Sequence, residues 1–172
     1  MEFFPNFRGV LFRDIGPLIR DPAAFKRCID ELVNRYQAGK NQGRKIDVVL
    51  VAEARGYMFG SPLAHLIGAG IVQARKKGKL PGDVLQCQYK TEYSQECFEV
   101  QEGRIRKGDN VLIVDDLLAT SGTALAMADL AERSGGNVEE FAFIIELVNL
   151  RGREKLEGKG YKVFSIIKDS ED

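Results

Sequence analysis

Two patterns of apolar positions alternate along this 172-residue chain. Short runs of consecutive apolar residues, rich in β-branched side chains, are typical of strands that are buried on both faces. Segments before and between these runs predict helices, the first of them from apolar residues at helical spacing. The runs predict strands over residues 46–52, 71–74, 111–114, 141–147 and 161–166. A helix is predicted before the first run, over residues 22–38, and further helices between the runs, over residues 57–67, 122–134 and 152–156.

Strands that alternate with helices indicate an α/β protein with a parallel sheet and helices on both of its faces. Asp21-Pro22 is a good start for the first helix, because an aspartate N-cap precedes a proline at the first helical position, and Gly39 can end it. Residues 84–102 are polar with scattered aromatics, which is consistent with a mobile two-stranded excursion. No repeat or linker divides the chain, so we expect a single domain over residues 1–172.

The segment from Val111 to Thr123 carries the strongest functional signal. Asp115 and Asp116 follow a predicted core strand, and in α/β proteins the ligand crevice lies beyond the carboxyl ends of such strands. Unpaired amides at the start of the next helix, over residues 120–123, favour anions such as phosphate. Two carboxylates beside a phosphate cradle suit a ribose phosphate. An ordinary strand–loop–helix turn is the alternative, but adjacent acids there are costly to bury without a partner.

Two further segments are suited to anions. Glu53-Ala-Arg-Gly56 follows the predicted strand over residues 46–52, so Arg55 would face the same crevice, where an arginine suits pyrophosphate. A surface salt bridge is the alternative role for Arg55. Four cations lie within residues 75–79, for which a solvated charge run is the common alternative.

Composition excludes several classes of function. Lysine plus arginine and aspartate plus glutamate number 25 each, and this balance argues against a nucleic-acid binder with a strongly basic face. No apolar run approaches the ~20 residues of a membrane helix, and the first residues lack the features of a signal peptide. Cys28, Cys87 and Cys97 form no Cys-x-x-Cys pair, so with a single histidine a zinc site is improbable. We therefore expect a cytoplasmic protein with reduced thiols. Cys28 should pack in the core, and His65 should pack or cap a helix rather than act in catalysis.

Residues 115–123, Asp-Asp-Leu-Leu-Ala-Thr-Ser-Gly-Thr, resemble the 5-phosphoribosyl-1-pyrophosphate (PRPP) signature of the type I phosphoribosyltransferases, and the adenine-specific branch in particular. Residues 9–14, 53–57, 75–81 and 92–93 also stand where that family places its segments. The resemblance implies the type I phosphoribosyltransferase fold, with a small hood and a mobile β-excursion. The hood would cover about residues 1–20 and the mobile loop about residues 76–102.

The activity implied by this resemblance is that of a pentosyltransferase. Such an enzyme moves the 5-phosphoribosyl group from PRPP to adenine and forms AMP and pyrophosphate in purine salvage. The resemblance further implies a homodimer and Mg²⁺ that is bound mainly through PRPP and pyrophosphate, with no metal site of the protein's own. A phosphoribosyltransferase for another base, such as xanthine or orotate, is one alternative. A non-catalytic PRPP-sensing regulator is the other, although no basic helix for DNA binding is visible.

The resemblance also implies which residues bind each part of the substrates. Adenine would lie between Phe12 and Leu147, and backbone groups of Leu11 and Arg13 would contact its polar edge. Asp115 and Asp116 would act on the ribose as catalytic residues. The family often holds the peptide bond corresponding to Glu53–Ala54 in the cis state. The implied PRPP-binding residues are Glu53, Ala54, Arg55, Arg75, Lys76, Lys79, Asp115, Asp116, Ala119, Thr120, Ser121, Gly122 and Thr123, with Lys77 unassigned.

Ala119 bears on the choice of base. Enzymes of this family that use 6-oxopurines usually carry an aspartate there, and alanine can neither exchange a proton nor hydrogen-bond through its side chain. In the adenine-specific enzymes a glutamate of the mobile loop serves purine N7, and Glu92 occupies the matching place. The resemblance therefore implies that Glu92 is catalytic, whereas Glu96 and Glu99 of the same excursion should tolerate replacement. Ser121 stands where the family commonly has glycine.

Overall fold

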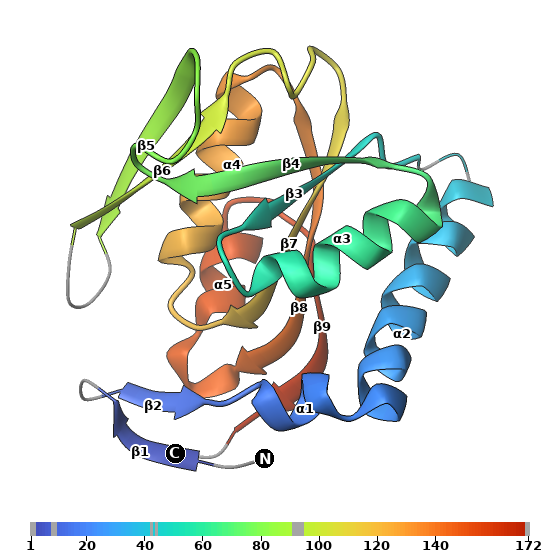
Figure 1. Ribbon diagram of the computed structural model, residues 1–172, viewed down its shortest axis with the longest axis vertical. Coiled ribbons are helices and arrows are strands. Elements are labelled where there is room, and N and C mark those ends of the chain that lie inside the picture. The colour runs from blue at the N-terminus through green and yellow to red at the C-terminus, as the bar shows by residue number, and fades with distance from the viewer. Residues whose placement is uncertain (1–2, 8–9, 42, 44, 91–94, 171–172) are drawn as a thin grey trace.

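A seven-stranded sheet forms the centre of the computed structural model, which describes residues 3–7, 10–41, 43, 45–90 and 95–170 (Figure 1). The strand order is β5-β6-β4-β3-β7-β8-β9. Neighbours from β4 to β9 pair in parallel, and the antiparallel hairpin of β5 and β6 joins the sheet at β4. The strands are β3 (Val48–Ala52), β4 (Gly70–Lys76), β5 (Val84–Lys90), β6 (Gln95–Gln101), β7 (Asn110–Leu118), β8 (Asn137–Leu147) and β9 (Val163–Asp169).

Helices cover both faces of this sheet, as the alternation of strands and helices predicted. Successive residues of β3 point to opposite faces. Leu50 packs in the core that includes residues of α4, and Val51 packs in the core that includes residues of α2 and α3. The helices are α1 (Gly16–Arg20), α2 (Pro22–Asn41), α3 (Gly56–Ile67), α4 (Gly122–Arg133) and α5 (Gly152–Glu157), with a 3₁₀ turn over Val148–Leu150 before α5.

The start of α2 confirms the predicted cap. The Asp21 Oδ1 atom accepts hydrogen bonds from the amides of Ala23 and Ala24 at 2.8 and 2.9 Å. The helix ends at Asn41, so Gly39 does not terminate it. Cys28 is buried on its inner side, which confirms the predicted packing role. His65 was expected to pack or cap, but its side chain is exposed in the last turn of α3.

Strands β4 and β7 are longer than the apolar runs predicted. β7 continues through Leu118 because β8 keeps pairing with it, whereas the pairing of β3 with β7 ends at Val114. Asp115 and Asp116 therefore lie inside β7, just after the point where β3 stops pairing with it. Two residues of the predicted basic loop, Arg75 and Lys76, likewise belong to β4, because β6 pairs with them. Pairing with a neighbouring strand outweighs local polarity in both places.

The N-terminal residues form a separate two-stranded sheet. Strands β1 (Phe3–Phe7) and β2 (Val10–Arg13) pair antiparallel and lie beside α1 at the lower end of Figure 1. The predicted hood covers this hairpin and α1, and its boundaries remain a prediction, as do those of the mobile loop. The excursion is two-stranded, as predicted, although β6 makes it part of the main sheet. None of the helices that the structure describes is long and apolar enough to span a membrane.

Candidate active site

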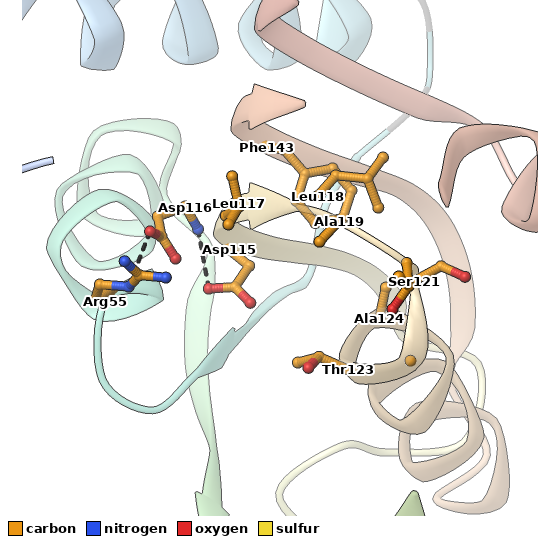
Figure 2. A pocket seen from close by; sticks show the side chains of 12 residues that line it. Arg55, Asp115, Asp116, Leu117, Leu118, Ala119, Ser121, Thr123, Ala124 and Phe143 are labelled. Carbon is orange, nitrogen blue, oxygen red and sulfur yellow. Dashed lines mark hydrogen bonds and ion pairs between the residues drawn. The ribbon is translucent and has the colours of Figure 1, made fainter. Parts of the chain in front are cut away.

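A cavity of about 190 Å³ opens where β7 ends and α4 begins. The long β7 supplies one wall, and the loop into α4 supplies the other. Figure 2 shows Arg55 and Asp116 together on one side of the cavity, with Ser121 and Thr123 across from them. The structure thus brings together residues that the sequence assigned to PRPP. The cavity is lined by Arg55, Asp115, Asp116, Leu117, Leu118, Ala119, Thr120, Ser121, Gly122, Thr123, Ala124 and Phe143.

The start of α4 has the properties of an anion site. Ser121 is the N-cap, with a φ of 75° in the left-handed region, which explains why a glycine suits this position. Its side chain does not cap the helix. The Ser121 hydroxyl is buried and has no hydrogen-bond partner among the described residues. A buried donor of this kind, beside the free amides of a first helical turn, fits a phosphate oxygen.

Asp115 is partly buried and Asp116 is buried, and the two carboxylates lie in different surroundings. Asp116 is 3% exposed, and its Oδ2 atom forms an ion pair with Arg55 Nε at 3.0 Å. The Asp116 amide donates to Asp115 Oδ1 at 2.9 Å. Burial raises the pKa of Asp115 well above its ordinary value, and the charge of Asp116 raises it further. Burial also raises the pKa of Asp116, although Arg55 opposes that rise. Hydroxyl donors from a ligand would relieve the cost of both charges.

The loop between β3 and α3 places Arg55 against Asp116. The peptide bond Glu53–Ala54 is cis, as the family resemblance implied. Gly56 then passes so close to β7 that an added Cβ would lie 3.0 Å from the Val114 carbonyl oxygen and 3.1 Å from Asp115 Oδ1. A glycine is therefore needed here for the approach of the loop to β7.

Glu53 binds the charged side chains of Arg75 and Lys79 and the backbone amide of Lys76, the three predicted pyrophosphate-binding residues of this segment. Its carboxylate accepts hydrogen bonds from Lys79 Nζ at 2.6 Å, from the Lys76 amide at 3.0 Å and from Arg75 Nε and Nη2 at 3.4 Å each. Burial opposes ionisation, but these bonds, that of Lys79 first, lower the pKa of Glu53 to about 2. None of the three cations lines the cavity. They contact Glu53, and Arg55 of the same loop lines the cavity. Their contact with pyrophosphate remains a prediction.

Glu99 holds the turn that presents Lys79. It is 1% exposed, and its Oε1 atom accepts hydrogen bonds from the amides of Lys79 and Leu80 at 2.9 and 3.0 Å. Its other oxygen accepts a hydrogen bond from Gln86 Nε2 at 3.4 Å. The expectation that Glu99 tolerates replacement is therefore revised. The polar pattern of residues 84–102 did not predict that the pairing of β6 with β4 would bury the Glu99 carboxylate.

Replacing Glu99 by Ala should lower the melting temperature and raise the KM for PRPP, while the KM for adenine changes little. Two amides would be left without an acceptor, at a cost of about 1–3 kcal/mol for a buried group. Differential scanning fluorimetry and initial rates measure both effects. Glu96→Ala is the matched control, because the Glu96 side chain is 31% exposed and pairs with Lys76 at 3.5 Å. Equal melting temperatures for the two variants would contradict a supporting role for Glu99.

Of the predicted adenine contacts, Leu147 is not among the described residues that line this cavity. Leu11, Phe12 and Arg13 belong to β2 of the N-terminal hairpin. Leu147 is buried at the end of β8 in the core that includes residues of α2 and α3. Glu92 lies outside the described residues. Phe143 lines the cavity, although the sequence analysis assigned it no role. It pairs opposite Asp115 across β7 and β8, and only the tertiary structure reveals this neighbour.

Comparison with known proteins agrees with a site for a phosphorylated ribose. A family model described as "Phosphoribosyl transferase domain" matches residues 19–172. The match spans every described strand of the main sheet and all residues that line the cavity. The chain therefore belongs to the phosphoribosyltransferase family.

Its relatives are, more particularly, adenine phosphoribosyltransferases. The protein of that name from Clostridium kluyveri is 47% identical over 168 residues, which cover 98% of this chain and 93% of that protein. The adenine phosphoribosyltransferase structure from Thermoanaerobacter pseudethanolicus matches with a TM-score of 0.87 at 42% identity, covering 98% of this chain and 95% of that one. The enzyme from Saccharomyces cerevisiae, complexed with an imino-altritol bisphosphate and adenine, gives 0.85 at 39% identity, with 96% and 93% covered. These neighbours confirm the expected type I phosphoribosyltransferase fold.

Proposed function

We propose that this enzyme transfers the 5-phosphoribosyl group from PRPP to adenine and releases AMP and pyrophosphate, a reaction of purine salvage. The observation that carries the proposal is the pair of adjacent carboxylates, the partly buried Asp115 and the buried Asp116, across one cavity from the unpartnered hydroxyl of Ser121. One side of the cavity suits ribose hydroxyls, and the other suits a phosphate. The close similarity to adenine phosphoribosyltransferases supports adenine as the acceptor.

In the proposed reaction the protein acts by positioning and by charge. Residues 120–123 bind the 5′-phosphate, and Asp115 and Asp116 bind the ribose hydroxyls. The bond from the ribose to pyrophosphate breaks while the bond to the adenine nitrogen forms, so the ribosyl carbon gains positive charge. The negative charge of the two aspartates, in a site sheltered from water, stabilises that charge. Arg55 and the cations around Glu53 receive the pyrophosphate.

We also propose that Mg²⁺ accompanies PRPP, as in phosphoribosyltransferases generally. Among the described residues, no three His, Cys, Asp or Glu side chains are grouped to hold a metal ion. The oxygen atoms of Asp115 and of PRPP suit this hard cation, which prefers oxygen ligands and keeps several waters. When bound, it would neutralise charge on the pyrophosphate.

The base specificity is tested by incubating the protein with PRPP, Mg²⁺ and single bases, and by measuring the nucleotide that forms. We expect AMP from adenine and little product from hypoxanthine, guanine, xanthine or orotate. A preference for hypoxanthine or guanine would contradict the argument from Ala119. PRPP binding without product from any base would favour a PRPP-sensing regulator instead.

Alanine at Arg75, Lys76 or Lys79 should weaken PRPP binding about tenfold, the loss of one charge-assisted contact of about 1.5 kcal/mol. Binding should also become less sensitive to salt, while adenine affinity barely changes. Isothermal titration at two salt concentrations measures both. Lys77→Ala, which removes an equal charge from the same segment, separates a specific contact from the effect of net charge. Equal losses for PRPP and adenine would indicate a structural role.

We further propose a homodimer that works in the cytoplasm. Met58 and Leu66 of α3 and Ile71 of β4 expose large apolar side chains, which a second copy could cover. The three cysteines are free thiols, as is usual in a reducing compartment. Sedimentation should show a dimer, and mixing Arg75→Ala with Arg55→Ala should restore activity if each site uses cations of both chains. No rescue in a verified heterodimer would indicate that one chain builds each site.

A further inference from the structure

The short helix α5 packs directly against the loop that precedes α4. Gly152, its first residue, is buried, and an added Cβ there would lie only 2.1 Å from the Ala119 carbonyl oxygen and 3.0 Å from Leu118 Cδ1. Both Leu118 and Ala119 line the cavity, whereas no described residue of α5 does. The helix therefore lies behind the loop, and only glycine permits the contact.

A second contact holds the next carbonyl of the same loop. Lys155 Nζ donates a hydrogen bond to the Thr120 carbonyl oxygen at 3.3 Å. In a planar trans peptide the C=O of one residue and the N–H of the next point in opposite directions. Because the carbonyls of Ala119 and Thr120 face α5, the amides of Thr120 and Ser121 face away from it. Helix α5 thus sets the direction of two amide donors of the proposed 5′-phosphate site.

Buried polar contacts tie α5 to the main sheet. Arg153 Nε lies 2.9 and 3.1 Å from the two Glu146 carboxylate oxygens, and Arg153 Nη2 donates to Oε2 at 2.6 Å. Arg153 also donates to the Val163 carbonyl oxygen at 2.7 Å and to Ser165 Oγ at 2.9 Å. Glu146 is 4% exposed and pairs opposite Leu118 across β8 and β7. A bidentate pair of this kind, with a buried carboxylate and an arginine that is 22% exposed, fixes both position and orientation.

We propose that Gly152 and the Arg153–Glu146 ion pair position the 5′-phosphate loop. This inference rests on the proposed function for the identity of the anion. Gly152 sets how closely α5 approaches the Ala119 carbonyl, and Arg153 holds α5 against β8 and β9. The loop amides then meet the phosphate without having to reorient, and the pyrophosphate contacts of Arg55 do not depend on α5.

The test compares Gly152→Ala with Gly70→Ala by titrating ribose 5-phosphate and pyrophosphate separately. Gly70 is the matched control, because an added Cβ there would make only an ordinary contact, 3.5 Å from the Asp47 carbonyl oxygen. Losing two amide hydrogen bonds to a charged phosphate, at about 1.5 kcal/mol each, corresponds to about 10²-fold in affinity. We expect Gly152→Ala to weaken ribose 5-phosphate binding by about that factor and pyrophosphate binding less than twofold. Gly70→Ala should change neither. Equal weakening of both ligands, or unchanged ribose 5-phosphate binding, would overturn the proposal.

Arg153→Lys keeps the inference testable if Gly152→Ala fails to fold. Lysine preserves the charge but not the two-pronged contact with Glu146. The same selective loss of ribose 5-phosphate affinity is expected, at a smaller factor. If the wild-type chain binds ribose 5-phosphate in this Gly152-dependent way but forms no AMP, the proposed function fails while the positioning role stands. If the wild-type chain does not bind ribose 5-phosphate, the positioning role fails as well.

Discussion

Replacing Asp115 and Asp116 together by Asn should lower kcat/KM for PRPP at least ~10²-fold, since each decade corresponds to 1.36 kcal/mol of lost transition-state stabilisation. Asparagine keeps the size of the side chain but removes the negative charge beside the ribosyl carbon. The two single variants should each lose part of this activity. Initial rates with adenine and PRPP measure the effect. A double variant with wild-type activity would remove both residues from the chemistry.

The same substitutions should affect stability in the opposite sense. Burial raises the pKa of Asp115 above its ordinary value of 3.8, so at pH 7 its charge destabilises the empty folded chain. Asp115→Asn should therefore raise the melting temperature at pH 7. The gain in melting temperature should shrink as the pH falls toward 4, because the Asp115 carboxyl of the wild-type chain is then protonated and no longer carries a destabilising charge. Asp116→Asn should stabilise less, because Asp116 is paired with Arg55. Thermal unfolding between pH 4 and 7 distinguishes the two variants.

Replacing Glu92 by Ala should lower kcat about 10²–10⁴-fold, the usual contribution of a general acid or base. Glu92→Gln should retain more activity, because the amide can still donate a hydrogen bond to the purine although it cannot transfer a proton. PRPP binding should stay near that of the wild-type chain in both variants. Steady-state kinetics with adenine, together with titration of PRPP, measure these effects.

Glu96→Ala, at a carboxylate of β6 four residues further along the chain, is the control for Glu92. Its kcat should stay close to that of the wild-type chain. Rates for Glu92→Ala equal to those of Glu96→Ala would exclude Glu92 as the group that handles the purine proton, and the PRPP site would be unaffected by that result. Glu99 is unsuitable as a control, because its carboxylate holds the turn that presents Lys79.

Local patterns were sufficient for the fold class and for bringing two carboxylates and a helix start together in one candidate site. Apolar runs and helical spacing depend only on nearby residues, so they predicted the five parallel strands and the helices on both faces. The segment from Asp115 to Thr123 is also local, since a strand, two acids and a helix start follow one another in the chain. For the same reason the cap at Asp21 was predicted and found.

Only the tertiary structure decided which charged groups meet. Pairing with β8 extends β7 past Asp115, and the pairing of β6 with β4 places Glu99 next to the turn that carries Lys79. Two cations expected to face pyrophosphate, Arg75 and Lys79, bind the carboxylate of Glu53, which comes from the turn after β3. These contacts join residues about twenty or more positions apart. No periodicity in the chain encodes them, because strand order and register are set by the packing of the whole sheet.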